Sequence, residues 1–291
     1  MKRYVLVYNP ISGHSRVKEQ LDYMIDSFER RGAMTIPYRT RLDDTEMAEF
    51  IREAAPSGVL AMGGDGTLKE VVTTIVSNKI DVPIAVIGSG TSNDFANHLG
   101  VTSDIESYFD RIVAGKTEPS DIGKANDEYF VNVASAGMFT SVAHEVNARL
   151  KHAMGKAAYY LRGIGELPSF HPMSLSVIAD EIKYEMSAYF FIIVNSTIAA
   201  GMKNAAPLAD IADGKLDMLA VHECSMKDFV TLAAQVIGGH VRPDDKNVFY
   251  IQASRIDVST DGEVESDLDG ERGPMLPLRV ETLHHAIRLF V

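Results

Sequence analysis

Short apolar runs alternate with stretches of helical periodicity through the first 120 residues, and this alternation restricts the chain to few folds. Residues 4–8 form an apolar run that is followed by apolar residues at helical spacing up to Phe28, and the same order recurs from Thr35 and from Val59. Strands that alternate with helices in this way are typical of a mostly parallel sheet covered by helices. We therefore predict a doubly wound α/β domain over residues 1–120.

Beyond residue 120 strands dominate the pattern. They are expected at residues 129–134, 173–179, 182–186, 188–194, 216–221 and 248–258. Asp180 and Glu181 lie between two of these runs and predict a hairpin. A β-rich, sandwich-like second domain is therefore predicted over residues 121–277, and residues 278–291 are expected to return and complete the first domain.

Three polar loops that contain glycine follow strands of the predicted parallel sheet, at residues 9–13, 63–67 and 88–94. In a doubly wound sheet, ligands bind beyond the carboxyl ends of the strands. Glycine has no Cβ, so backbone N–H groups can approach a phosphate at the positive end of the following helix. Each loop alone is also explained as an ordinary turn or helix cap, whereas three such loops at one edge predict a phosphate-binding site.

Two of these loops contain a carboxylate. Asp65 would repel a bare phosphate, so a divalent cation or a substrate hydroxyl is its expected partner. Asp94 is expected to face the same crevice, although Asp94 or Asn93 could instead cap the helix that follows.

The order of the three loops resembles a known family. Asn-Pro-Ile-Ser-Gly at 9–13, Gly-Gly-Asp-Gly-Thr at 63–67 and Gly-Thr-Ser-Asn-Asp-Phe-Ala at 90–96 are similar to the catalytic region of bacterial diacylglycerol kinases and related lipid kinases. The resemblance covers nearly the whole chain and implies that the loops hold ATP. The implied nucleotide contacts are Asn9, Ser12, Gly13, Thr40, Gly63, Gly64, Asp65, Gly66, Thr67 and Thr91. Lys69 departs from the uncharged residue expected at its position, and we expect this to have little consequence.

In this family an Asp-Gly-Glu sequence near the C terminus carries the glutamate thought to act as general base. Two copies occur here, at 261–263 and at 269–271. The resemblance favours Glu271, since an apolar residue precedes its copy and Pro277 follows it closely. The copy at 261–263 is expected to form a hairpin tip.

Residues 210–217 combine oxygen donors with Gly214 just before a predicted strand, as a loop that binds a hard cation would. An Asp-Gly turn by itself is usually only a turn. The resemblance implies a structural Mg²⁺ here, bound by the carboxylate of Asp213 and by the backbone carbonyls of Asp210 and Lys215.

Composition argues against several other classes. A net charge of −12 argues against nonspecific binding to nucleic acid. The apolar run at residues 188–194 is far shorter than the about 20 residues of a membrane-spanning helix, and no export signal precedes the first strand, so we expect a cytoplasmic protein. The single cysteine, Cys224, forbids an internal disulfide. The nine histidines show no metal-ligand spacing, since adjacent His284 and His285 would point to opposite faces of a strand.

Residues 140–167 are locally basic, with tyrosines interleaved, in an otherwise acidic chain. The basic side chains are Arg149, Lys151, Lys156 and Arg162. They predict either a solvated helix face or contact with anionic lipid, to which each basic residue contributes about 1 kcal/mol. Peripheral association with the inner face of the membrane follows from the second possibility. An exposed edge strand in the second domain could also pair two chains in a homodimer.

The resemblance implies an ATP-dependent lipid kinase, most simply one that converts diacylglycerol to phosphatidic acid. Glu271 would accept the proton of the acceptor hydroxyl, Mg²⁺ near Asp65 would offset phosphate charge, and Asp94 would orient the hydroxyl or the metal. Two alternatives are a kinase with a soluble acceptor, as in the NAD kinases, and a noncatalytic nucleotide or lipid sensor.

Overall fold

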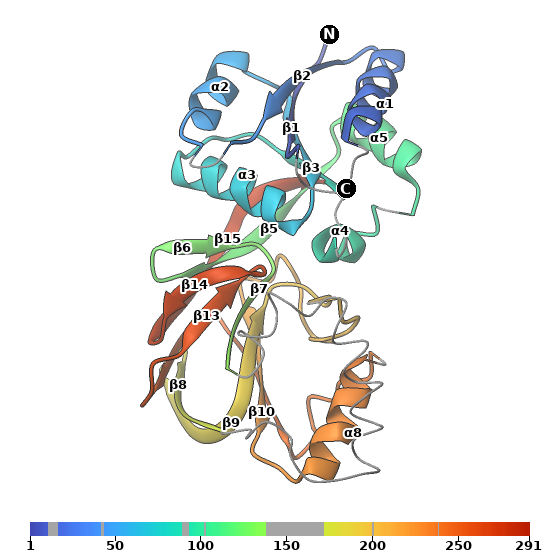
Figure 1. Ribbon diagram of the computed structural model, residues 1–291. Helices are drawn as coiled ribbons and strands as arrows, with labels where there is room; N and C mark the ends of the chain where they lie inside the picture. Colours follow the sequence, from blue (N-terminus) through green and yellow to red (C-terminus); the bar gives the residue numbers. More distant parts are fainter. Residues whose placement is uncertain are drawn as a thin grey trace.

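The computed structural model describes residues 1–10, 17–41, 44–88, 93–101, 103–137, 172–199, 201–237 and 239–291. The chain builds an α/β region, drawn at the top of Figure 1, and a β-rich region below it. Strands of the two regions belong to one continuous hydrogen-bonded sheet of 15 strands.

The α/β region repeats strand and helix as predicted. Its elements are β1 (Arg3–Tyr8), α1 (Val17–Arg30), β2 (Met34–Arg39), α2 (Met47–Ala54), β3 (Gly58–Gly63), α3 (Asp65–Ser77), β4 (Ile84–Gly88), α4 (Asp94–His98) and α5 (Ile105–Ala114). The strand order is β2-β1-β3-β4, and all three of these pairings are parallel. Helices α1 and α5 lie on one side of this sheet and α2 and α3 on the other (Figure 1), so the predicted doubly wound class is confirmed.

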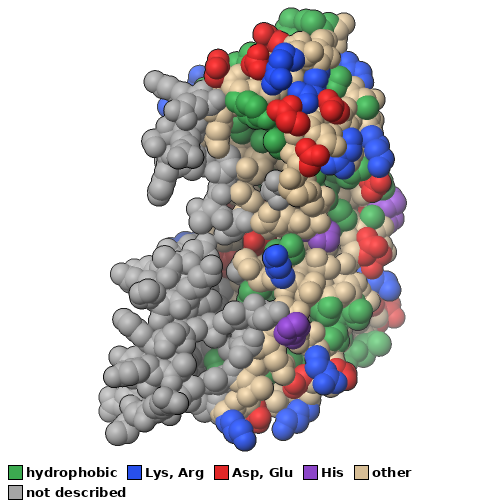
Figure 2. Space-filling view, turned by 90° about the vertical axis from the view of Figure 1, so that its right-hand side faces the viewer, with side chains coloured by type: hydrophobic (Ala, Val, Ile, Leu, Met, Phe, Trp, Pro, Cys, Tyr) green, Lys and Arg blue, Asp and Glu red, His purple; other side chains and the backbone are tan. Residues whose placement is uncertain are grey.

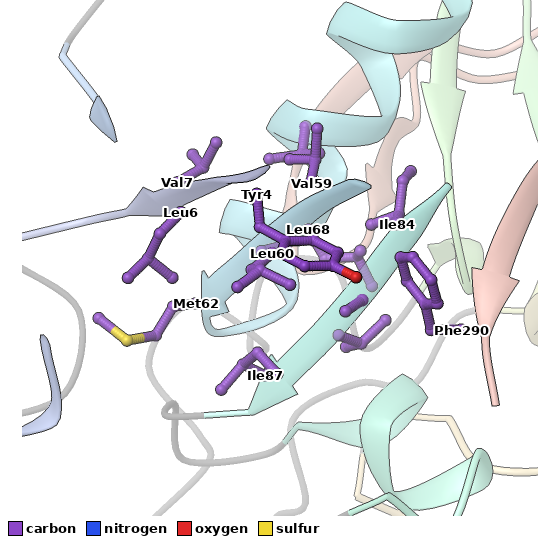
Figure 3. Close-up of a cluster of buried hydrophobic side chains, with 14 of the residues drawn as sticks. Tyr4, Leu6, Val7, Val59, Leu60, Met62, Leu68, Ile84, Ile87 and Phe290 are labelled. Carbon is purple, nitrogen blue, oxygen red and sulfur yellow. The ribbon is translucent and has the colours of Figure 1, made fainter. Parts of the chain in front are cut away.

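The core of the α/β region lies between the sheet and its helices. Val5, Leu6, Val59 and Leu60 on the two central strands are fully buried. Parallel strands that are covered on both faces lack a polar side, so they read as continuous apolar runs. Figure 3 shows Leu6, Val59 and Leu60 packed with Leu68 of α3 and with Phe290 from the far end of the chain.

The β-rich region is mostly antiparallel. Its elements are β5 (Thr117–Ala125), β6 (Glu128–Phe130), β7 (Val133–Gly137), β8 (Met173–Ala179), β9 (Ile182–Val194), β10 (Leu216–His222), α8 (Met226–Ile237), β11 (Val248–Ala253), β12 (Arg255–Thr260), β13 (Glu265–Leu268), β14 (Glu271–Met275) and β15 (Leu278–Phe290). The predicted hairpin is present, since β8 and β9 pair from Ala179 and Ile182 onward.

Two strand predictions differ from the structure. The runs expected at 182–186 and 188–194 form the single long strand β9. The run expected at 248–258 is two strands that break at Ser254, whose N–H donates to the carboxylate of Asp180. The chain changes neighbours at this break, because β11 pairs with β10 whereas β12 pairs with β8 and β15.

The last strand, β15, runs through both regions. It begins antiparallel to β12 in the β-rich region, and near its end Leu289 pairs with Ile84 of β4, parallel to the α/β sheet. Strand β5 pairs with β15 in both regions, with a register shift between Leu283 and Ile287. This two-stranded ribbon joins the regions in Figure 1.

The two Asp-Gly-Glu copies lie in different kinds of connection between strands. Asp269 and Gly270 form the two-residue turn between β13 and β14, with φ of 56° and 87°. Left-handed φ at both positions is the signature of a type I′ hairpin turn, for which Asp-Gly is a preferred pair. Asp261 and Gly262 instead connect β12 to β13, which are not neighbours in the sheet. The prediction of a hairpin tip at 261–263 is therefore wrong.

Among the described residues, no helix is both long and apolar enough to cross a bilayer. Figure 2 shows one face of the molecule, on which acidic and basic side chains are interspersed over the described part of the α/β region.

Candidate active site

The strand ends that bear the polar loops lie at one edge of the α/β sheet. The register pairs Tyr8 of β1 with both Arg39 of β2 and Met62 of β3, and it pairs Gly63 with Gly88 of β4. The chain therefore leaves all four strands at the same level. Asn9 and Thr40 follow β1 and β2 directly, and the N–H of buried Thr40 donates to the carbonyl of Tyr8. Ser12, Gly13 and Thr91 lie outside the described residues.

The glycine turn joins β3 to α3 with almost no spare room. A Cβ at Gly63 would clash with the side chain of Thr67, which is buried against the turn. Gly64 is extended, and its carbonyl accepts the N–H groups of Thr67 and Leu68 in the first turn of α3. The positive end of the α3 dipole therefore points to this edge of the sheet, where an anion is stabilised.

Asp65, the first residue of α3, connects the second loop to the third. Its Oδ2 accepts the backbone N–H of Asp94 at 3.4 Å. Burial raises the pKa of the Asp65 carboxyl, and the backbone N–H groups of Asp94 and Phe95 oppose that rise. The carboxylate thus faces the N terminus of α4 from a neighbouring helix.

Asp94 reaches from the α/β region to the β-rich region. Its side chain is buried, and its Oδ2 accepts the N–H of Gly201 at 2.8 Å. One turn later on the same helix, His98 Nδ1 lies 3.0 Å from Oγ1 of Thr197. Asn93, in the left-handed conformation, makes no side-chain cap for α4. Asp94 and His98 thereby link α4 to Gly201 and Thr197.

Glu271, the first residue of β14, lies at the glycine turn. A Cβ at Gly66 would be 3.4 Å from its Oε1. Its other oxygen, Oε2, lies 3.0 Å from Nζ of Lys69 on α3. The hairpin that carries Glu271 is anchored by Asp269, whose carboxylate accepts the N–H groups of residues 131, 132 and 133 at 2.7 to 2.9 Å. Burial raises the pKa of Asp269 to about 6.

Lys69 contacts Glu271, the predicted base. The sequence analysis did not predict this contact. One signal was available: Lys69 follows Asp65 by four residues on α3, so both side chains lie on the same face of the helix. The structure thus brings Asp65, Asp94, Glu271 and the Gly66 backbone together and adds Lys69 to them.

The predicted metal loop lies apart from these residues in the sequence and has its own contacts. Oδ1 of Asp210 accepts the N–H of Ala212 at 3.0 Å, and Oδ1 of Asp213 accepts the N–H of Lys215 at 2.9 Å. Both carboxylates are exposed, and the loop offers only oxygen donors. This donor set fits a hard cation such as Mg²⁺.

His284 and His285 were predicted to point to opposite faces of a strand, and this prediction is wrong. Their rings stack with centroids 3.6 Å apart, because β15 is irregular here and His285 has a φ of 51°. Among the described residues, they and buried Asp121 form a group with ligand atoms within 4.8 Å of one another. Hydrogen bonds already engage that group: His284 Nδ1 lies 2.9 Å from Oδ1 of Asp121, and the N–H of Gly214 donates to Oδ2 of Asp121. The group joins β5, β15 and the 210–214 loop.

Comparison with known proteins assigns the family. The model of the diacylglycerol kinase catalytic domain matches residues 3–125, and that of the YegS C-terminal NAD kinase beta sandwich-like domain matches residues 132–291. The diacylglycerol kinase of Bacillus subtilis is 31% identical over 293 residues, which cover 99% of this chain and 96% of that one. This chain belongs to the diacylglycerol kinase family. It is therefore a kinase.

Other members of the diacylglycerol kinase family agree with this assignment over the full length. A diacylglycerol kinase of Staphylococcus epidermidis is 33% identical across 99% of this chain and 92% of its own. A crystal structure of a diacylglycerol kinase from Bacillus anthracis has the same fold, with a TM-score of 0.74, 22% identity, and coverage of 99% of this chain and 96% of that one. A second structure from that organism is 25% identical, with a TM-score of 0.79 and coverage of 99% and 94%.

Proposed function

We propose that this kinase transfers the γ-phosphate of ATP to the hydroxyl of a lipid, with diacylglycerol as the acceptor and phosphatidic acid as the product. One observation carries the proposal: the carboxylate of Glu271 lies beside Gly66, in the turn that begins α3. A base is thereby next to the backbone on which the phosphates would rest, and it comes from a hairpin of the other region.

In the proposed reaction, the oxygen of the acceptor hydroxyl forms a bond to the γ-phosphorus while the bond from that phosphorus to the β,γ-bridging oxygen breaks. The hydroxyl proton passes to Glu271, and ADP leaves. The chain contributes mainly positioning and charge, as phosphoryl transfer requires. We assign the phosphate contacts to the glycine turn and to Asn9 and Thr40 at the same sheet edge.

A divalent cation completes this proposal. Asp65 would hold Mg²⁺ near the phosphates, directly or through water; burial raises the pKa of its carboxyl, and a bound cation would favour the charged form. When bound, Mg²⁺ supplies neutralisation of phosphate charge. The loop at 210–215 would hold a second, structural Mg²⁺ through Asp213 and the carbonyls of Asp210 and Lys215.

We assign ATP binding to a domain of residues 1–120 completed by 278–291, and lipid binding to residues 121–277. The pairing of β15 with β4 supports the first assignment. Membrane contact through the basic stretch rests on sequence alone, because residues 140–167 lie outside the described residues. If a variant neutralised at Arg149, Lys151 and Lys156 sediments with anionic vesicles as well as wild type does, that contact is refuted.

A homodimer through an edge strand of the β-rich region is a further proposal. Within the described residues, β11 and β14 each have one neighbouring strand. Sedimentation equilibrium at several protein concentrations tests it, and a monomer at all of them refutes it.

One experiment tests the acceptor. The protein is incubated with radiolabelled ATP and Mg²⁺ in three parallel reactions that contain diacylglycerol vesicles, NAD or no acceptor, and each is then extracted with organic solvent. Label in the organic phase supports the proposal. Label in the dinucleotide supports the NAD kinase alternative, to which the 132–291 match is related by fold alone. Label in neither supports a noncatalytic sensor.

A further inference from the structure

Lys69 makes two contacts that both belong to the β13–β14 hairpin. Its Nζ donates to the carbonyl of Leu268 at 3.1 Å and to Oε2 of Glu271 at 3.0 Å. The two partners flank the Asp269-Gly270 turn and lie 199 and 202 positions from Lys69 in the sequence. A single ammonium group thus fastens the hairpin of the β-rich region to the helix that begins at the glycine turn.

The Lys69 side chain is unusually well covered for a lysine on a helix. It is 12% exposed, whereas Glu271 is 59% exposed. In the similar pair of Lys183 and Glu185 on β9, both side chains are more than half exposed, at 62% and 58%. Exposed pairs contribute little, because solvent screens the charges and both side chains lose freedom. A covered ammonium that also donates to the backbone carbonyl of Leu268 instead gives the Glu271 carboxylate a defined orientation.

The two oxygens of Glu271 therefore have separate surroundings. Oε2 is engaged by Lys69, and Oε1 faces the turn at Gly66. Asp269 fixes the backbone of the same hairpin through three N–H groups, so the side-chain torsions of Glu271 are the freedom that Lys69 restricts.

We propose that Lys69 is a positioning residue for phosphoryl transfer: its ammonium holds Oε2 of Glu271 so that Oε1 stays over the glycine turn, where the acceptor proton is taken up. This role rests on the proposed lipid kinase function. A positioning role gives a reason for the basic residue at position 69, where the family resemblance led us to expect an uncharged one. The role requires no contact between Lys69 and ATP.

The test uses the full-length protein with ATP, Mg²⁺ and diacylglycerol vesicles, after thermal unfolding has shown that each variant is folded. Lys69→Met keeps the length of the side chain and removes its charge, and we expect kcat to fall about tenfold to a hundredfold with KM for ATP unchanged. Lys69→Arg restores a cation that can reach the carboxylate and should recover most of the loss. Lys183→Met removes the exposed pair on β9 and should match wild type.

A double-mutant cycle decides whether Lys69 acts through Glu271. In the Glu271→Gln background, Lys69→Met should cause no further loss of kcat, because the carboxylate that it positions is gone. An equal loss in both backgrounds overturns the proposal, and so does a raised KM for ATP with kcat unchanged, which would identify a phosphate contact. Full activity of Lys69→Met overturns the role of Lys69 alone. Absence of label transfer by wild type overturns the lipid kinase function and this role with it.

Discussion

The backbone N–H of Asp94 donates a hydrogen bond to Oδ2 of Asp65 across 3.4 Å. Each is the first residue of its helix, so the second and third loops are tied together at their helical ends by the protein itself. The Asp65 carboxylate therefore has two roles: it supplies a negative charge, and it accepts a backbone N–H from the next loop.

Substitutions at Asp65 should distinguish these two roles. Asp65→Asn keeps an oxygen for the N–H of Asp94 but loses the charge, so we expect a melting temperature near that of wild type and at least an approximately hundredfold lower kcat. Asp65→Ala loses both and should also unfold at a lower temperature. Circular dichroism melts and vesicle kinase assays measure the two effects. Near-normal turnover by Asp65→Asn would show that the charge is not required.

Replacement of Glu271 by Gln should slow transfer without weakening nucleotide binding. General-base catalysis contributes roughly a hundredfold to ten-thousandfold, so we expect kcat to fall by at least about a hundredfold while KM for ATP stays the same. Glu263→Gln, in the copy that connects β12 to β13, is the matched control and should behave as wild type. A loss of activity in the control and not in Glu271→Gln would reverse the assignment.

Asp269 should contribute strongly to stability. Its carboxylate accepts N–H groups of residues 131–133, two of which, Val131 and Asn132, are buried. Asp269→Ala leaves these donors without an acceptor, and we expect the free energy of unfolding in urea to fall by about 2–4 kcal/mol. Asp261→Ala, in an exposed connection, should change it by less than about 0.5 kcal/mol. Equal effects of the two substitutions would contradict this role.

Glu70 should make stability fall as pH rises. Burial, together with the charges of Asp44 and Glu271, raises its pKa to about 7 from the ordinary 4.5. A carboxyl whose pKa is higher in the folded state binds its proton more tightly there, so its contribution is complete below about pH 4.5 and is lost as pH rises through 7. Because the group is half exposed, we expect Glu70→Gln to gain no more than about 1 kcal/mol over wild type at pH 8 and nothing at pH 4. Thermal melts at both pH values, with exposed Glu53→Gln as control, measure the difference; a gain that is equal at both would contradict the assignment.

Gly63 should not tolerate a side chain. A Cβ there would overlap Thr67, which is buried against the turn, whereas a Cβ at Gly262 would meet no atom within 4 Å. Overpacking of this kind costs about 1–3 kcal/mol, so Gly63→Ala should lower the free energy of unfolding by that amount and Gly262→Ala should not. Equal urea midpoints for the two variants would show that Thr67 moves aside freely.

The sequence predicted most of the α/β region because its signals are local. Leu6 and Leu60 belong to continuous apolar runs, since their strands are covered on both faces. Asp44 lies just before α2, and its Oδ1 accepts the N–H of Met47, the first residue of that helix. Ser225 immediately precedes α8, and its Oγ accepts the N–H of Asp228 in the first turn of that helix.

Features that depend on distant contacts were missed. The left-handed φ of His285 interrupts the alternation of side chains between the two faces of β15. No glycine next to it in the sequence indicates this conformation. Only the Asp-Gly pair at 269–270 connects two neighbouring strands, and the pair at 261–262 does not. Hydrophobic periodicity does not report which strands are neighbours in the sheet. The pairing of Lys69 with Glu271 spans 202 positions, so only the helical spacing from Asp65 hinted at it.

A strand that belongs to both regions leaves little room for a swinging motion between them. Closure over a ligand in many two-part enzymes depends on a few loose residues that act as a pivot. Here β5 and β15 are paired in both regions, and only the register shift between Leu283 and Ile287 interrupts their pairing. Any relative movement must therefore twist the ribbon at that shift, and it must also strain the contacts of Lys69 with Glu271 and of Asp94 with Gly201, which cross between the regions.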